Sequence, residues 1–465
     1  MPRRVNGSRI AGCVGMLDRE VDANEEKRLM GKAKRASQRV GASHSELALL
    51  GGPKAVQRGS PAWPVVDEID VSHMEAVVRS GQWSWVGPHE TAFLREWAGF
   101  LGCKYAMCVA NGTVSMEIAL QALGVKPGDE VIVPGMTWVA TLQAPLTIGA
   151  NAVVVDVDPE TYCIDPKAIE KAITPRTRAI IPVHLYGCMC DMDAIMAIAQ
   201  KHGLKVVEDA AHQQGSAWKG KRAGAIGDAG SFSFQQSKVL TCGEGGSVVF
   251  RDDEQAYRTA FALKHVGWLP EMSPGEVYGH NFRITEMQAV LLRGGLRRLP
   301  EQTRIREENV AYLRERLDSI GGPLRIAKRD PRVTIQAYYC LSMHYDKRKF
   351  GNLPRALFLE PLSHEGWSMG GPYAPVYRHP LLNLYHPTSP VPYRPKEQRI
   401  QDYRSLRLPV TERVFEEEGV FMGHTALLGG RQLMDEFILA YEKVLNNQTA
   451  IRRYYQEKER QQAKA

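Results

Sequence analysis

Residues 230–246 read Gly-Ser-Phe-Ser-Phe-Gln-Gln-Ser-Lys-Val-Leu-Thr-Cys-Gly-Glu-Gly-Gly, an aromatic, strand-like segment followed by a short loop. The loop presents one lysine, Lys238, and the glycines after it let backbone and ligand approach closely. A lysine amine that is held still and partly desolvated can form a Schiff base with a carbonyl. Most lysines lie on the surface, however, so the segment alone indicates only a candidate site.

Before this segment, short apolar strands alternate with helices along the chain. This alternation favours an α/β fold with a mainly parallel sheet covered on both faces. Ligands of such sheets bind at the carboxyl ends of the strands. We expect strands at 105–110, 130–133, 152–157, 179–185 and 205–207, helices at 68–80, 90–101, 114–123 and 191–202, and a long charged helix at 299–317.

Several chemistry-bearing residues fall at these strand ends. The turn Asn111-Gly112-Thr113 opens a helix, whose N-terminus offers N–H groups to a phosphate. Such a turn is weak evidence alone, because many strand-to-helix turns read this way. Trp138, Tyr186, Asp209 and His212 follow later strands.

The combination indicates pyridoxal phosphate. This cofactor needs donors for its phosphate, a flat apolar face for its ring, a carboxylate for its pyridine nitrogen and a lysine for its aldehyde. Gly112-Thr113, Trp138, Asp209 and Lys238 supply these four groups. A buried aspartate at a strand end is costly unless it is paired, which favours a functional role for Asp209.

These segments resemble the sugar and cyclitol aminotransferases of the DegT/DnrJ/EryC1/StrS family, which are fold-type I pyridoxal-phosphate enzymes. The matching motifs follow the family's order over about residues 46–300, and later stretches such as 372–380 and 408–413 are also similar, so that only the N-terminal extension and about the last fifteen residues fall outside. The motifs are specific in combination but modest singly. The matching stretches are 109–113, 134–141, 183–187 with 191–192, 208–212, 231–246, and 279–283 with 286–288.

The resemblance implies roles for individual residues. Lys238 would form the Schiff base and move protons, and Asp209 would pair with the pyridine nitrogen. Trp138 would stack on the ring, and His212 would lie near it, although a buried structural histidine is an equal alternative. The phosphate would be held by Gly112, Thr113, Ser233 and Ser237 and by Asn281 of a neighbouring subunit, while Trp83, Tyr186 and Glu244 are candidate substrate contacts. The aromatic loop with Trp83 fits a turn at the edge of the core equally well.

The length of the chain and the distribution of its charges indicate how it is divided into domains and terminal segments. A chain of 465 residues exceeds one ordinary core, so we expect two packed domains. The resemblance implies a large cofactor-binding αβα domain at 46–300 and a smaller C-terminal α/β domain at 301–450. Residues 1–45 read as a disordered basic extension and 451–465 as a charged tail. Residues 1–40 carry five of the seven net positive charges, so the body is nearly neutral and a nucleic-acid-binding surface is not indicated.

Other classes of site are disfavoured. No apolar run approaches the length of a membrane span. The eight cysteines read as buried, reduced thiols of a cytoplasmic protein, and Cys188-Met-Cys190 lacks the spacing of a metal or redox pair. Residues 369–380 and 381–393, rich in proline, glycine and tyrosine, are expected to form a substrate-side loop.

The resemblance therefore implies an aminotransferase in which glutamate or glutamine gives its amino group to a keto group on a sugar, nucleotide-sugar or cyclitol. A homodimer with shared active sites is implied by the resemblance. Residues 235–238 and 243–246 favour the cyclitol and aminohydroxybenzoate-synthase branch. The alternatives are an aminohydroxybenzoate-synthase-like dehydratase or aromatase and a non-catalytic binding protein. Lys238 argues against family members that have lost this lysine and act as deoxysugar dehydratases.

Overall fold

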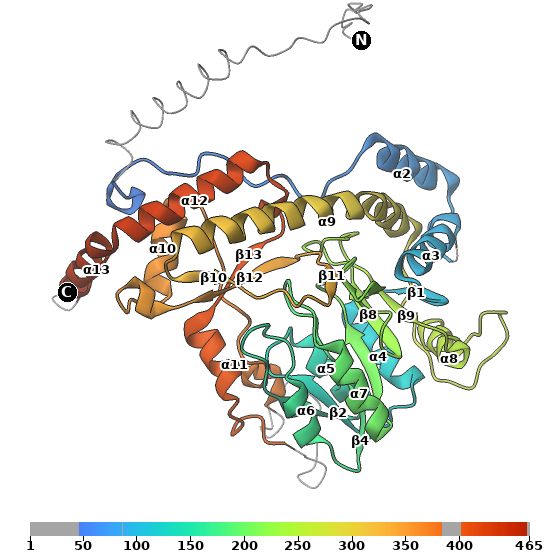
Figure 1. The fold of residues 1–465 in the computed structure, drawn as a ribbon. Helices are drawn as coiled ribbons and strands as arrows, with labels where there is room; N and C mark the ends of the chain where they lie inside the picture. Colours follow the sequence, from blue (N-terminus) through green and yellow to red (C-terminus); the bar gives the residue numbers. More distant parts are fainter. Residues whose placement is uncertain (1–45, 86, 384–400, 463–465) are drawn as a thin grey trace, which may run out of the picture.

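A seven-stranded sheet forms the centre of the computed structural model, which describes residues 46–85, 87–383 and 401–462 (Figure 1). Strands β8, β5, β4, β2 and β3 pair in parallel, and β9 runs antiparallel between β1 and β8. The predicted α/β class with a mainly parallel sheet is confirmed. In spatial order the strands are β1 (Tyr105–Val109), β9 (Gly246–Phe250), β8 (Ala229–Ser233), β5 (Lys205–Asp209), β4 (Thr177–Ile180), β2 (Glu130–Pro134) and β3 (Asn151–Val155).

Both faces of this sheet are buried. Successive residues of a strand point to opposite faces, so Ile132 of β2 enters one core while Val131 and Val133 enter the other. The first core is covered by α3 (Pro88–Leu101), α6 (Pro166–Ala172), α7 (Met192–His202) and the start of α9 (Glu286–Ile320), and the second by α4 (Gly112–Ala122), α5 (Ala140–Thr147) and α8 (Glu254–Lys264). Layers of helix, sheet and helix therefore hold the carboxyl ends of the strands rigidly.

One predicted strand was too long. Strand β4 covers only Thr177–Ile180, whereas the apolar run predicted a strand from 179 to 185. Pro182 lies in this run and has no N–H to donate to a sheet ladder. Val183 keeps a single bridge to Asp209, so the chain leaves the sheet at the edge where ligands are expected.

Helix α9 begins 13 residues before its predicted start. Thr285 caps it, and Gln288 completes a capping box with Thr285. The helix continues through Pro300, the predicted division between the two domains, and contributes to the cores on both sides. A side chain at Gly294 would overlap the Asp70 carboxylate, so this glycine allows α2 (Glu68–Ser80) to pack closely.

The C-terminal part has its own core around a three-stranded antiparallel sheet in the order β10-β12-β13. Its strands are β10 (Leu324–Ile326), β12 (Cys340–Tyr345) and β13 (Gly419–Gly423), and its helices are α10 (Ala356–His364), α12 (Arg431–Asn446), α13 (Gln448–Gln462) and the second half of α9. A second three-stranded sheet pairs β6 (Ala217–Trp218) with β7 (Lys221–Arg222) on one side and with β11 (Val333–Ile335) on the other. The short helix α11 spans Pro409–Arg413. Ile451 and Tyr455, in the stretch predicted as a tail, are buried in this core.

A buried carboxylate ties the start of the described chain to the C-terminal part. Glu365 accepts hydrogen bonds from the N–H groups of Ala48 (2.8 Å) and Ala55 (3.0 Å) and pairs with Lys443 Nζ (2.9 Å). Lys443 also donates to the carbonyl of Pro53. The side chains of Glu365 and Lys443 are almost completely buried, so the charge of each is compensated by the opposite charge of the other.

We expect Glu365→Ala to lower the free energy of unfolding by about 3–5 kcal/mol, because Lys443 would stay buried without a counter-charge. Urea denaturation followed by circular dichroism measures the change. The matched control is Glu160→Ala, which removes an exposed ion pair with Arg325 and should cost less than about 1 kcal/mol. Equal effects of the two substitutions would contradict the assigned role of Glu365.

Three remaining predictions concern the chain as a whole. The seven cysteines in the described ranges are free thiols, six of them buried, as predicted. Within 46–85, 87–383 and 401–462, the helices are all too short or too polar to cross a bilayer. The basic extension at 1–45 lies outside the described residues.

Candidate active site

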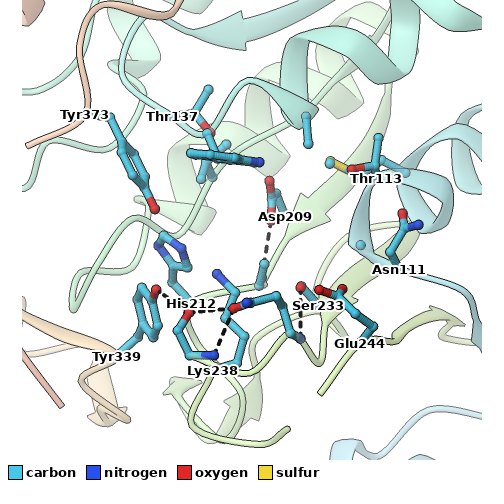
Figure 2. A pocket seen from close by; sticks show the side chains of 18 residues that line it. Asn111, Thr113, Thr137, Asp209, His212, Ser233, Lys238, Glu244, Tyr339 and Tyr373 are labelled. Atoms are coloured by element: carbon cyan, nitrogen blue, oxygen red, sulfur yellow. Dashed lines mark hydrogen bonds between the residues drawn. The ribbon is translucent and has the colours of Figure 1, made fainter. Parts of the chain in front are cut away.

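A cavity of about 470 Å³ opens at the carboxyl edge of the parallel strands (Figure 2). Figure 2 shows Asp209, His212 and Lys238 directed toward a common space, with Asn111 and Thr113 at one side of it. The turn before α4, the turn before α5, the end of β5 and the loop after β8 all contribute to its lining. Of the predicted site residues, the cavity brings together Gly112, Thr113, Trp138, Asp209, His212, Ser233, Ser237, Lys238 and Glu244.

The N-terminus of α4 forms one end of the cavity. Asn111 caps the helix by accepting a hydrogen bond from the N–H of Val114 (3.0 Å). Ser233, at the end of β8, packs directly against this turn, since a Cβ at Gly112 would lie 2.8 Å from Ser233 Cβ. Helix N–H groups and the hydroxyls of Thr113 and Ser233 thus lie together, a chemistry suited to a phosphate.

Gly112→Ala should weaken the binding of a phosphate-bearing ligand by about tenfold or more. The new methyl group would push the helix end away from Ser233, and one lost hydrogen bond to a charged group costs about 1.5–3 kcal/mol. Titration of pyridoxal phosphate, followed by its absorbance, gives the dissociation constant. The control is Gly99→Ala in α3, where a Cβ meets nothing within 4 Å. An unchanged dissociation constant for Gly112→Ala would refute the tight-packing argument.

Asp209 ends β5 and lies on the floor of the cavity, where it is only 7 % exposed. Its carboxylate accepts hydrogen bonds from Thr141 Oγ1 (2.9 Å) and from the N–H of Ala211 (3.2 Å). Thr141 is held in turn by Thr137 (2.7 Å). Burial raises the pKa of Asp209, while these donors and the charge of Lys238 oppose the rise. A buried carboxylate with this support can pair with a protonated ring nitrogen.

Lys238 lies in a loop closed by backbone hydrogen bonds. The N–H of Phe234 donates to Gly245 and that of Gln236 to Gly243, both at 2.8 Å. Burial lowers the pKa of Lys238 to about 8, and the negative charge of Asp209 partly offsets this effect. Near pH 8 a large fraction of the amine is therefore neutral and able to attack a carbonyl.

His212 lines the cavity as a neutral imidazole. Its Nδ1 accepts a hydrogen bond from the N–H of Tyr186 (3.1 Å), and burial lowers its pKa well below the usual value. Its ring stacks on Tyr339 with centroids 4.1 Å apart. Tyr186 itself lies behind this layer, where its hydroxyl accepts from the N–H of Tyr373 (2.6 Å), and it is not among the lining residues.

Two further predicted residues lie outside the cavity of the single chain. Trp83 is 51 % exposed and donates from Nε1 to the carbonyl of Val78 (3.2 Å). Asn281 is exposed and forms an isolated bridge with His265.

Residues that the sequence did not single out complete the lining. Thr137 belongs to the stretch 134–141 that carried the family resemblance, so its position could have been inferred from that motif. Tyr373 comes from the predicted substrate-side loop 369–380, whereas 384–393 of the adjoining segment lie outside the described residues. Tyr339 comes from the C-terminal part and carries no local signal.

The chain is similar in sequence and fold to known proteins. An L-glutamine:2-deoxy-scyllo-inosose aminotransferase of Streptoalloteichus tenebrarius is 36% identical over 426 residues, covering 87% of this chain and 99% of that protein. An L-glutamine:scyllo-inosose aminotransferase of Streptomyces griseus is 36% identical over 423 residues, covering 87% and 98%. The crystal structure of 3-amino-5-hydroxybenzoic acid synthase matches with a TM-score of 0.73 and 34% identity over 84% of this chain and 99% of that one.

The model of the DegT/DnrJ/EryC1/StrS aminotransferase family matches residues 64–419, more than three-quarters of the chain. This range includes the sheet that forms the cavity and about half of the C-terminal core. The predicted fold class and enzyme class are confirmed by these matches. The chain belongs to the DegT/DnrJ/EryC1/StrS family of aminotransferases.

Proposed function

We propose that this chain binds pyridoxal 5'-phosphate and transfers the amino group of glutamine to the keto group of an inosose, a keto-cyclitol. The observation that carries the proposal is one cavity that combines the N-terminus of α4, the buried carboxylate of Asp209 and the amine of Lys238. Its relatives are named for glutamine as donor and inososes as acceptors, which supports the choice of substrates.

The residues present fit this cofactor. The turn at Gly112 is packed too closely against Ser233 for a side chain, which leaves the helix N–H groups accessible to a phosphate. Trp138, 60 % exposed at the cavity, offers an aromatic face, and its ring lies 5.7 Å from that of Tyr373. Asp209 and Lys238 supply the acceptor and the amine that the ring nitrogen and the aldehyde require.

The bound cofactor would supply a carrier for the amino group and a ring that delocalises the electron pair left at the donor carbon. Lys238 would hold the cofactor covalently through Nζ, and as a free amine Nζ would move a proton from the donor carbon to the carbon that carried the cofactor's aldehyde. Asp209 would keep the ring nitrogen protonated through its buried carboxylate, oriented by Thr141. Thr113 and Ser233 would anchor the phosphate, so that these transfers occur at fixed positions.

The same chain is proposed to act as a homodimer. Large apolar side chains are exposed on two segments, 83–85 and 266–278. The bridge between Ser84 and Thr285 joins the first segment to the chain just after the second, and His265 and Asn281, which flank the second segment, form another bridge. Exposed apolar groups gathered in this way are typical of an interface. These side chains are Trp83, Trp85, Val266, Trp268, Met272 and Tyr278. Asn281 is exposed in the same region, which supports its proposed contact with the neighbouring subunit.

The decisive experiment incubates the full-length protein and pyridoxal phosphate with L-glutamine, L-glutamate or L-alanine and a panel of keto acceptors. We expect the amino-cyclitol product, detected by mass spectrometry, with an inosose and glutamine. Amination of a nucleotide-linked keto-sugar but not of an inosose would overturn the acceptor assignment. An aromatic elimination product would favour the aminohydroxybenzoate-synthase-like alternative, and absence of turnover with a bound, visible cofactor would favour a binding protein.

The pH dependence of cofactor capture provides a test of the lysine. Only the neutral amine attacks, and the pKa of Lys238 is about 8. The rate at which Lys238 reacts with pyridoxal phosphate should therefore rise about tenfold per pH unit below pH 8 and level off above pH 8. Stopped-flow absorbance between pH 6 and 10 measures this rate. In Asp209→Asn the midpoint should move to lower pH, because the Asp209 charge raises the pKa of Lys238. A flat profile would exclude Lys238 as the reacting group.

A further inference from the structure

The segment just before Lys238 is held by side chains from outside the large sheet. Tyr339 directly precedes β12, and His424 directly follows β13. These strands are paired, with Cys340 opposite Gly423, and the N–H of His424 donates to the carbonyl of Tyr339 (3.1 Å). The end of the small sheet therefore presents both side chains as one unit.

Both side chains reach Ser237. Tyr339 Oη and Ser237 Oγ are 3.0 Å apart, and His424 Nε2 lies 2.9 Å from the carbonyl oxygen of Ser237. A carbonyl can only accept, so His424 carries its proton on Nε2. Trp63 adds a third contact, since its Nε1 donates to the carbonyl of Gln236 (3.1 Å) and its ring meets that of His424 edge-on.

The Tyr339 ring also contacts the reactive amine. Lys238 Nζ lies 4.4 Å from the centroid of this ring, a distance typical of a cation–π contact. The other titratable groups that act on Lys238 are Asp209 and Cys340. His212 stacks on Tyr339, so the ring joins the lysine to the wall of the cavity.

His424 is suited to a permanent structural contact. It is 4 % exposed, and burial together with the charge of Arg306 lowers its pKa to about 3. The imidazole is therefore neutral at the pH values at which an enzyme of this kind works. Its hydrogen bond to Ser237 consequently does not change with pH.

We propose that Tyr339 and His424 are positioning residues that hold Lys238 Nζ at its reacting position by fixing Ser237. This inference rests on the proposed function, in which Lys238 is the reacting amine. Neither residue exchanges a proton with the substrate. Their effect reaches the chemistry through the backbone and the aromatic contact, and it makes the lysine depend on the C-terminal part of the chain.

The test compares Tyr339→Leu and His424→Leu with the milder variants Tyr339→Phe and His424→Gln in the full-length protein. Glutamine places a donor nitrogen as many bonds from Cβ as His424 Nε2, and phenylalanine keeps the ring. The control is His344→Leu, because His344 is also a neutral histidine of the small sheet but bonds Tyr162 (2.8 Å), away from Ser237. Urea denaturation accompanies each variant, so that stability and catalysis are separated.

We expect each leucine variant at the two positions to lower kcat by about 10- to 100-fold, since small displacements of reacting groups have effects of this size. KM for glutamine should change less than about threefold, because neither residue is assigned to donor binding. His424→Gln should recover most of kcat, and His344→Leu should retain it. Equal losses of kcat in His344→Leu and His424→Leu at equal stability would overturn the proposal.

A second readout does not depend on turnover. Acylation of Lys238 in the cofactor-free chain, followed by peptide mass spectrometry as a function of pH, reports the state of the amine directly. In Tyr339→Leu the midpoint should move to lower pH, because the ammonium loses the ring face, and in Tyr339→Phe it should stay. An unmoved or raised midpoint in Tyr339→Leu would overturn the role of the ring. If the wild type turned over no substrate but these midpoints behaved as expected, the proposed function would fail and the positioning contacts would stand.

Discussion

Replacement of Lys238 by alanine is expected to lower the rate of transamination by at least about 10⁴-fold while the chain still folds and still binds pyridoxal phosphate non-covalently. The loss is large because one amine serves both as the covalent partner and as the base, and a positioned base alone contributes about 10²–10⁴-fold. Binding should persist because the N-terminus of α4 and Asp209 do not depend on Lys238 for their positions.

Single-turnover absorbance with L-glutamine measures this effect, and equilibrium titration measures the retained binding. Lys238→Arg is the matched control, because it keeps a positive charge beside Asp209 but cannot act as a neutral amine. A small primary amine added to the solution should partly restore the rate of Lys238→Ala and should not restore that of Lys238→Arg. A glutamine half-reaction at the wild-type rate in Lys238→Ala would assign the chemistry to another residue.

The sheet could be predicted from the sequence because its strands and helices carry strong local signals. The helix at Glu68–Ser80 was predicted at its observed bounds, since Asp67 caps it and Gly81 ends it in the left-handed conformation. The start of α9 was missed, because Gly294, Gly295 and Pro300 are unfavourable in an isolated helix. Tertiary packing against Asp70 explains why a glycine is tolerated at Gly294.

The site could be predicted only where its residues follow the strands directly. Asp209 and the turn at Gly112 lie at strand ends, and the parallel sheet brings such ends to one edge. Tyr339 and His424 lie 101 and 186 positions after Lys238, and no periodicity connects them with it. Their contacts arise from the packing of the C-terminal sheet against the lysine loop, which a single sequence does not reveal.

Asp209→Asn is expected to reduce kcat by about 10²–10³-fold, the effect of removing one preorganised electrostatic partner. Asparagine has nearly the same shape: its Oδ1 can still accept from the N–H of Ala211, and its Nδ2, in place of the second carboxylate oxygen, can donate to the Thr141 hydroxyl, so the fold should be preserved. What is lost is the negative charge that would keep the cofactor's ring nitrogen protonated. The rate of proton removal from glutamine, measured with deuterium at the α-carbon, should fall with kcat.

Two controls separate this charge from its surroundings. Thr141→Val keeps the carboxylate but removes one donor, and a lost hydrogen bond to a charged group costs about 1.5–3 kcal/mol, so an intermediate loss of about 10- to 100-fold is expected. Asp156→Asn alters a carboxylate that accepts from Val410 and Thr411 beyond the end of β3, away from the cavity. It should change stability while kcat stays within about threefold of the wild type. Of these two residues, Asp209 faces the cavity that holds Lys238 and Asp156 does not. If Asp156→Asn and Asp209→Asn lowered kcat equally, the effect at Asp209 would therefore be structural.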